Sequence, residues 1–158
     1  PRWLQIDFSG AVQHLAEQSE AEVASDQIHQ LFCETYLDVP GAWSLGRYEV
    51  TKDDTEHQLA AVLGAGDGET PIQGRGTGVL DAFINAMEQV TGKNMVLVEY
   101  SEHTLGQSSD AEAVCYVQLN IEGARPCGVG RSNDIVQATL NAILSALQGH
   151  CQLTENAA

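Results

Sequence analysis

Basic side chains are scarce in this chain, and their scarcity excludes two classes of partner. The 158 residues hold 7 Lys and Arg against 22 Asp and Glu, a formal net charge of −15. A surface of this charge repels the phosphate backbone of a nucleic acid and an anionic membrane surface alike. We therefore expect no nucleic-acid partner and no membrane role.

Long apolar runs and paired cysteines are missing as well. No stretch approaches the roughly 18 uninterrupted apolar residues of a membrane span, and no basic-then-apolar leader opens the chain, so we expect a cytoplasmic protein. The chain opens at Pro1 within a helical pattern, which suggests a fragment of a longer protein. Cys33, Cys115, Cys127 and Cys151 form no C-x-x-C pair, so we expect reduced, mostly buried thiols.

Helical periodicity marks the first forty residues. Apolar residues recur at helical spacing in two sets, Leu4, Phe8, Val12 and Leu15, then Ile28, Leu31, Phe32 and Leu37. Pro40 and Gly41 are expected to end the second helix. Two short amphipathic helices without a core between them cannot stand alone, so residues 1–40 are predicted to be a helical linker subdomain beside a main domain, 41–158.

From about residue 42 the apolar pattern becomes typical of strands. It predicts strands at 43–51, 57–63 and 70–74, then a helix at about 78–90 that Gly92 stops. The same order returns as strands at 95–100, 113–121 and 126–130 and a helix at about 133–148. The chain is therefore expected to contain a β-β-β-α unit twice, as repeat 1 at about 42–93 and repeat 2 at about 94–151.

Sequence identity between the two units supports a duplication. Ile84-Asn85-Ala86 and Leu140-Asn141-Ala142 lie 56 positions apart, and the same offset pairs Gly74 with Gly130 and the expected N-caps Thr77 and Asn133. A helix covers one face of each sheet, and two units can cover each other. We predict an α+β fold of two pseudo-symmetric β-β-β-α units packed together, preceded by the helical linker and extended by a homodimer.

Glycine-rich turns lead from strand to helix in both units, at Gly74-Arg75-Gly76-Thr77-Gly78 and Gly128-Val129-Gly130-Arg131-Ser132-Asn133. Free amide N–H groups at a helix start suit a carboxylate, and glycine lets a ligand approach closely. The alternative is that these glycines only make tight turns. Small and apolar residues that could wall an amino-acid pocket are Leu80, Leu97, Ala111, Ala113 and Ile135.

A catalytic site is much less well supported by the sequence. The segment Tyr100-Ser101-Glu102-His103-Thr104 could supply acid-base groups, with Cys115 or Ser108 as a nucleophile, but nothing fixes these side chains together. A polar strand end is the better interpretation. The five histidines show no H-x-H or H-E-x-x-H spacing, so we expect no metal site and no catalytic residues.

Three motifs occur in order, from Gly74 to Ala82, from Glu99 to His103, and from Gly128 through Asp134 to Ala138. They resemble the C-terminal regulatory domain of 2-isopropylmalate synthase, and the opening Pro1–Ser9 resembles the linker that leads out of the catalytic barrel in that family. Together they extend over nearly the whole chain, and their joint order is more specific than any one motif.

The resemblance implies a leucine-binding allosteric domain for feedback inhibition in leucine biosynthesis. The parent enzyme would be an acetyl-CoA-dependent acyltransferase with a divalent metal in an upstream barrel of the same polypeptide, whereas this chain would have no activity and no cofactor. L-leucine would bind between the two units near the homodimer interface. The implied pocket consists of Gly76, Thr77, Gly78, Leu80, Asp81, Leu97, Tyr100, Thr104, Ala111, Ala113, Asn133 and Ile135.

Other functions fit the same sequence. An isoleucine-sensing regulatory domain of citramalate synthase would share the fold, because a pocket separates leucine from isoleucine by only about 1–3 kcal/mol. A structural dimerisation module without a ligand is a second alternative. A small hydrolase using Tyr100, Glu102 and His103 is a third, and a double-stranded RNA binder is disfavoured by the charge.

Overall fold

The computed structural model describes residues 1–20, 22–39, 41 and 43–157. Pro40, which was expected to help end the second helix, and residue 42, the expected start of repeat 1, lie outside the described residues. Two helices form the predicted linker, α1 (Arg2–Ser19) and α2 (Ser25–Phe32), and α2 continues into a π-helical turn, η1 (Cys33–Leu37). Among the described residues, no helix is both long and apolar enough to cross a membrane.

Two β-β-β-α units follow the linker, so the predicted fold class is confirmed. The first contains β1 (Ser44–Lys52), β2 (His57–Ala65), β3 (Gly68–Gly76) and α3 (Val79–Thr91). The second contains β4 (Met95–Leu105), β5 (Glu112–Ile121), β6 (Cys127–Ser132) and α4 (Ile135–Ala157). Both sheets are antiparallel, in the orders β1-β2-β3 and β4-β5-β6.

The helix boundaries differ slightly from the prediction. Helix α3 is capped by Gly78, where Thr77 was expected, and α4 begins after Asp134, where Asn133 was expected. The cap at the other end of α3 is confirmed, since Gly92 adopts the left-handed conformation with a φ of 70°. Helix α4 runs to Ala157, well past the expected end near Gln148, and in this extension Cys151 packs against the core while Leu153 is exposed.

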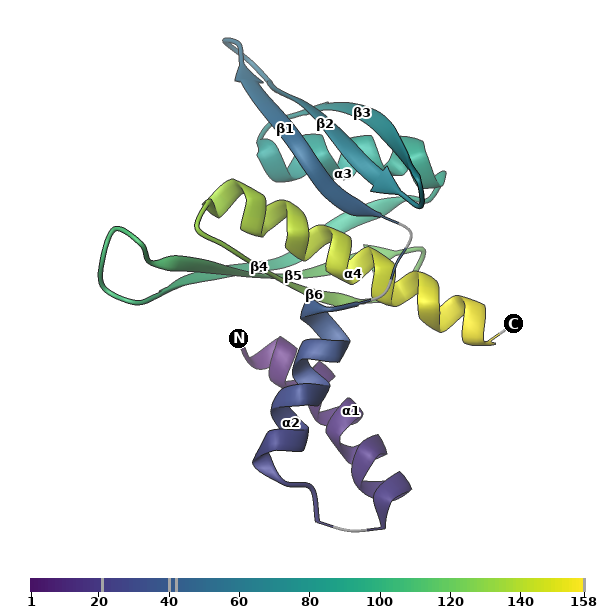
Figure 1. The fold of residues 1–158 in the computed structure, drawn as a ribbon. Helices are drawn as coiled ribbons and strands as arrows, with labels where there is room; N and C mark the ends of the chain where they lie inside the picture. Colours follow the sequence, from purple (N-terminus) through teal and green to yellow (C-terminus); the bar gives the residue numbers. More distant parts are fainter. Residues whose placement is uncertain (21, 40, 42, 158) are drawn as a thin grey trace.

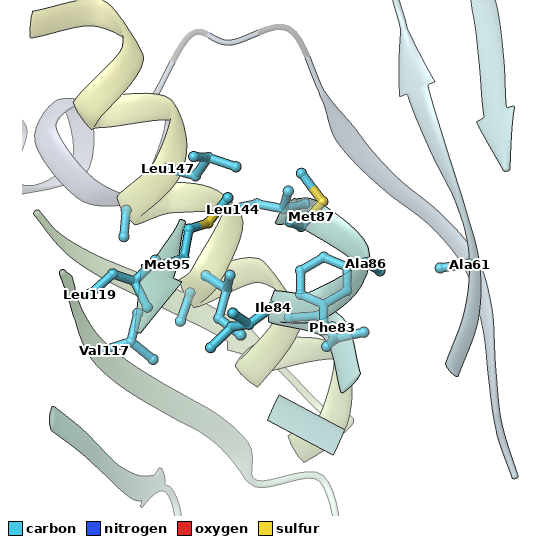
Figure 2. Close-up of a cluster of buried hydrophobic side chains, with 14 of the residues drawn as sticks. Ala61, Phe83, Ile84, Ala86, Met87, Met95, Val117, Leu119, Leu144 and Leu147 are labelled. Carbon is cyan, nitrogen blue, oxygen red and sulfur yellow. The ribbon is translucent and has the colours of Figure 1, made fainter. Parts of the chain in front are cut away.

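Both helices lie between the two sheets (Figure 1). Their apolar faces meet in a core to which both repeats contribute (Figure 2). Side chains buried there include Phe83, Ile84 and Met87 of α3, Leu144 and Leu147 of α4, and Leu63 and Leu119 of the sheets. Each unit therefore covers the apolar face of the other, as the duplication predicts.

The linker covers the outer face of the second sheet alone (Figure 1). Val114 and Val129 point outward from β5 and β6 into a cluster with Leu4 and Tyr36 of the linker. The residues 56 positions earlier, on the outer face of the first sheet, are Gln58 and Gln73. Burial of valine favours linker docking on one sheet, whereas the glutamines keep the matching face of the other polar.

A buried hydroxyl fastens the linker to repeat 2. Ser145 of α4 donates to the carbonyl oxygen of Tyr36 at 2.5 Å and accepts the amide N–H of Val129 at 3.2 Å. The Tyr36 hydroxyl donates to Asp7 of α1 at 2.5 Å. One serine therefore joins the linker, the edge strand β6 and helix α4.

Cys115 and Cys127 are buried free thiols, and Cys33 and Cys151 are half-buried free thiols.

Glycines on β3 and β6 allow each helix to press directly on its strand. A Cβ on Gly130 would lie 1.9 Å from the carbonyl oxygen of Ala138, and one on Gly128 would lie 2.1 Å from that of Ala142. In repeat 1, a Cβ on Gly74 would lie 2.0 Å from the carbonyl oxygen of Ala82. These distances leave no room for a side chain, so the glycines are required for packing.

We predict that Gly130→Ala destabilises the fold by roughly 3 kcal/mol, because α4 must move off the strand to admit the methyl group. Gly10→Ala is the matched control, since a Cβ at Gly10 in α1 meets nothing within 4 Å. It should be neutral or stabilising by up to about 1 kcal/mol. Urea unfolding measures both values, and equal stability of the two variants would contradict the packing role.

Ser145→Ala should destabilise the protein by about 1–3 kcal/mol, because it leaves the Val129 amide and the Tyr36 carbonyl without their hydroxyl partner. Hydrogen exchange should speed up first in the linker helices. Ser9→Ala, which removes an exposed hydroxyl bonded within α1 to Ile6, should change stability by less than about 0.5 kcal/mol. Unchanged exchange in the linker of Ser145→Ala would contradict the anchoring role.

Candidate functional site

At the start of α3, Gly78 has free space around it, whereas the glycines before it are packed against the helix. A Cβ on Gly76 would meet the Asp81 carboxylate at 2.5 Å, so Gly76 lies under the helix. A Cβ on Gly78 would meet nothing within 4 Å, and Gly78 has an extended backbone with a φ of −153°. Gly74, Gly76, Gly128 and Gly130 therefore make room for the helices that pack against them, while Gly78 faces open space.

A hollow of about 490 Å³ lies at this helix start, between α3 and the beginning of β4. Its lining consists of Thr77, Gly78, Val79, Leu80, Asp81, Ile84, Asn85, Met95, Val96 and Leu97. Five of these were predicted as site residues, namely Thr77, Gly78, Leu80, Asp81 and Leu97. Of the others, Ile84 lies one helical turn after Leu80, so helical periodicity could have identified it.

The N-terminus of α3 presents unpaired amide donors to the hollow. The N–H groups of its first turn, at Val79, Leu80 and Asp81, have no acceptor within the helix. Among the described residues, no side chain caps this helix end. The Asp81 carboxylate turns back to accept the backbone N–H of Thr77 at 3.0 Å and the Thr77 hydroxyl at 3.4 Å. The helix dipole therefore favours an anion here, with Asp81 beside it.

Tyr100 lies three residues beyond Leu97 on β4 and contacts repeat 2. Its hydroxyl donates to Glu102 and lies 3.3 Å from the Thr139 hydroxyl and 3.8 Å from the Cys115 sulfur. Burial and the hydrogen bond to Glu102 raise the pKa of Tyr100, so the hydroxyl stays protonated at neutral pH. Tyr100 therefore borders α4 and does not line the hollow at the start of α3.

The remaining predicted residues lie around the start of α4 and on the β4–β5 hairpin. Asn133 and Ile135 are exposed at the beginning of α4, and the Ile135 carbonyl lies 3.9 Å from the Cys115 sulfur. Thr104 pairs with the buried Ala113. Ala111 donates its amide to Ser108 in the loop of the hairpin, which projects from the body in Figure 1.

The three side chains of the suggested hydrolase site are not assembled. Tyr100 and Glu102 pair with Val117 and Cys115 on the inner face of the sheet. His103 lies on the opposite face, where its ring stacks on Tyr116 with centroids 5.3 Å apart. In the described part of the chain, no three His, Cys, Asp or Glu side chains come together to hold a metal ion.

Comparison with known proteins assigns the family. Residues 22–150 match the family model of the LeuA allosteric (dimerisation) domain. The chain belongs to this family. A dimerisation domain forms homodimers, and its family description is allosteric. The predicted resemblance to the regulatory region of 2-isopropylmalate synthase is confirmed.

Relatives of this LeuA dimerisation domain are named 2-isopropylmalate synthase. The chain is 40% identical over 150 residues to the protein of Rhizobium meliloti (strain 1021), a match that covers 92% of this chain and 27% of the relative. It is 33% identical over 150 residues to that of Alcanivorax borkumensis, covering 93% and 26%. The chain therefore spans about a quarter of the length of the curated relatives it matches.

Asp81→Ala should loosen the turn before α3, because the Thr77 amide and hydroxyl lose their acceptor. We expect a stability loss of about 1 kcal/mol and faster hydrogen exchange at the Thr77 amide. Asp81→Asn retains an acceptor oxygen and should lose less than half as much. Exchange at Thr77 that is the same in Asp81→Ala as in the wild type would show that this carboxylate does not order the turn.

Proposed function

We propose that this domain binds L-leucine at the start of α3 and carries the feedback regulation of a 2-isopropylmalate synthase. The open N-terminus of α3, set in a hollow with apolar walls, is the observation that carries the proposal. An amino acid has an anionic end, a cationic end and a side chain, and each finds a suitable group here. The family's allosteric description supports a regulatory role.

The amino-acid backbone fits the polar side of the hollow. Amide N–H groups of the first turn of α3 would bind the effector carboxylate, helped by the helix dipole. A carboxylate has about four acceptor positions, so Asp81 can hold Thr77 and still accept from an ammonium group. The carboxylate and the ammonium group of the effector would then contact neighbouring groups in the first turn of α3, the amide N–H groups and the Asp81 carboxylate.

The apolar side of the hollow fits a branched aliphatic side chain. Leu80 and Ile84 of α3 face Met95 and Leu97 of β4 across it. Leucine has about nine heavy atoms, so a binding free energy of about −7 kcal/mol and a Kd of about 10 μM are reasonable for such a pocket. The hollow is larger than leucine, which leaves room for side chains from a second copy.

The rest of the enzyme is part of the same proposal. The relatives extend well beyond this chain, and we infer that the parent polypeptide carries an upstream catalytic barrel that transfers an acyl group from acetyl-CoA with a divalent metal. A biosynthetic enzyme of this kind acts in the cytoplasm. If leucine at the regulatory site weakens substrate binding at the barrel, substrate bound there weakens leucine binding by the same factor.

Calorimetric titration of the full chain with leucine, isoleucine and valine tests the proposal. We expect saturable binding in which leucine is tightest. A preference for isoleucine would assign the site to a citramalate synthase, and no heat from any of the three in a folded dimer would favour a structural module.

Two matched variants locate the site. Val96 lines the hollow and is 62% exposed, whereas Val90 near the end of α3 is 37% exposed and lies outside the lining. Val96→Glu places a negative charge in the lining of the hollow, so leucine affinity should fall at least tenfold. Val90→Glu adds the same charge elsewhere and should leave the affinity unchanged. Equal effects of the two variants would move the site away from α3.

A further inference from the structure

A hollow lies between the last strand and the helix of each repeat. In repeat 1 it measures about 850 Å³ and lies beside β3 and α3, and in repeat 2 it measures about 530 Å³ and lies beside β6 and α4. Lining residues that are equivalent at an offset of 56 positions include Gly74 and Gly130, Arg75 and Arg131, and Asn85 and Asn141. The two hollows are therefore copies of one groove, produced by the duplication.

The linker closes the copy in repeat 2. The end of the linker, at 36–39, lines this hollow, and η1 contacts both β6 and α4. The chain that follows is held against α4, because Gln148 accepts the backbone N–H of Trp43 at 3.3 Å and leaves no space for a Cβ on Gly41. Among the described residues, no linker residue lines the copy in repeat 1. The linker therefore turns the open groove of repeat 2 into a pocket, which we call the linker pocket.

One side-chain amide is paired in repeat 1 and unpaired in the linker pocket. Asn85 donates to the carbonyl oxygen of Arg75 at 2.6 Å. The equivalent Asn141 lines the linker pocket, and its side chain makes no hydrogen bond to any described residue. Arg131 has the same orientation on β6 as Val129, whose N–H points away from β5 toward α4. The linker pocket therefore offers a ligand the donor and the acceptor that repeat 1 uses on each other.

Two further carboxamides extend this polar side. Gln137 and Gln148 line the linker pocket on the same face of α4 as Asn141, since they lie four residues before it and seven after it. The oxygen of Gln137 accepts the Ser132 hydroxyl at 3.2 Å, and that of Gln148 accepts the backbone N–H of Trp43. A carboxamide also carries two N–H donors, so these side chains add donors for a ligand.

Charge and apolar surface limit what the linker pocket can bind. Arg131 pairs with Glu112 at 2.6 Å, and Asp38 adds a second carboxylate, so the described lining residues carry a net negative charge. A ligand carboxylate or phosphate would be repelled. Trp43 and Leu144 supply aromatic and aliphatic surface. An uncharged ring with a donor and an acceptor side by side suits both the polar and the apolar groups.

We propose that the linker pocket is a second ligand site of this chain, for an uncharged aromatic ring that carries a carboxamide or the similar donor–acceptor edge of a nucleobase. This edge would pair with the Asn141 side chain and the Arg131 carbonyl, and the ring would contact Trp43. Among the described residues, the linker pocket shares no lining residue with the hollow at the start of α3, so the inference does not depend on the proposed leucine site. Bound ligand would favour the docked linker, which forms one wall of the pocket.

Proton–nitrogen NMR of the full chain, titrated with benzamide, adenine and benzoate, tests the proposal. The chain has two tryptophans, Trp43 in the lining and Trp3 on α1 outside it, so the second is an internal control. The Trp43 indole signal should shift saturably with benzamide and adenine, with a Kd on the order of 1 mM for so small a ligand, while Trp3 stays in place. Benzoate replaces the carboxamide by a carboxylate and should bind at least tenfold more weakly.

Matched variants of the two equivalent asparagines locate the site. Asn141→Ala should weaken benzamide binding at least fivefold, whereas Asn85→Ala should leave it unchanged. Asn141→Asp keeps the shape of the side chain, replaces the amide by a charge, and should weaken benzamide as much. Tighter binding of adenine than of benzamide would assign the site to nucleobases, and the reverse to carboxamides. A Trp43 signal that saturates with neither compound, equal affinity for benzoate, or unchanged benzamide affinity in both Asn141 variants overturns the inference.

Discussion

Direct contact between a strand backbone and a helix backbone is the constraint on which this fold depends. Gly74 of β3 and Gly130 of β6 leave so little space that the helix carbonyl lies where a side chain would begin. This closeness fixes the height of α3 and α4 above their sheets, so that both helices fit between the two sheets in a common core. It also fixes where each helix starts, and therefore where its free amide groups point.

Duplication supplied two similar units, and their outer faces then took different roles. Valines on the second sheet bury the linker, whereas glutamines at the same places keep the first sheet polar. Ser145, near the middle of α4, ties the linker to this helix, and the start of α4 meets Tyr48 of repeat 1 through Asp134. A single helix therefore contacts both the linker and the other repeat.

Most of the fold could be predicted from the sequence, because the period of the apolar residues and the glycine positions are local signals. Every strand was placed, and the errors lie at the ends of elements: the helix starts differ by about one residue, whereas β4 runs on to Leu105 and α4 to Ala157. The site was harder. The glycine-rich turn pointed to Thr77 and Gly78 and the apolar residues to Leu97, whereas Asp81 came from the family resemblance. Met95 and Tyr48 were missed, since their roles arise between elements distant in sequence.

The sequence by itself determined the two β-β-β-α units, the acidic surface and the glycine-rich turns, because propensity, charge and periodicity act over a few residues. Only the tertiary structure decided what each glycine does. Gly74 and Gly130 have the same neighbours in sequence as a ligand-binding turn, yet the helix backbone fills the space above them. Gly78 has no such cover, whereas Asp134, at the corresponding place in repeat 2, accepts a hydrogen bond from the Tyr48 hydroxyl of the other repeat. A pattern of letters cannot show which positions remain open, since openness depends on which distant atoms arrive there.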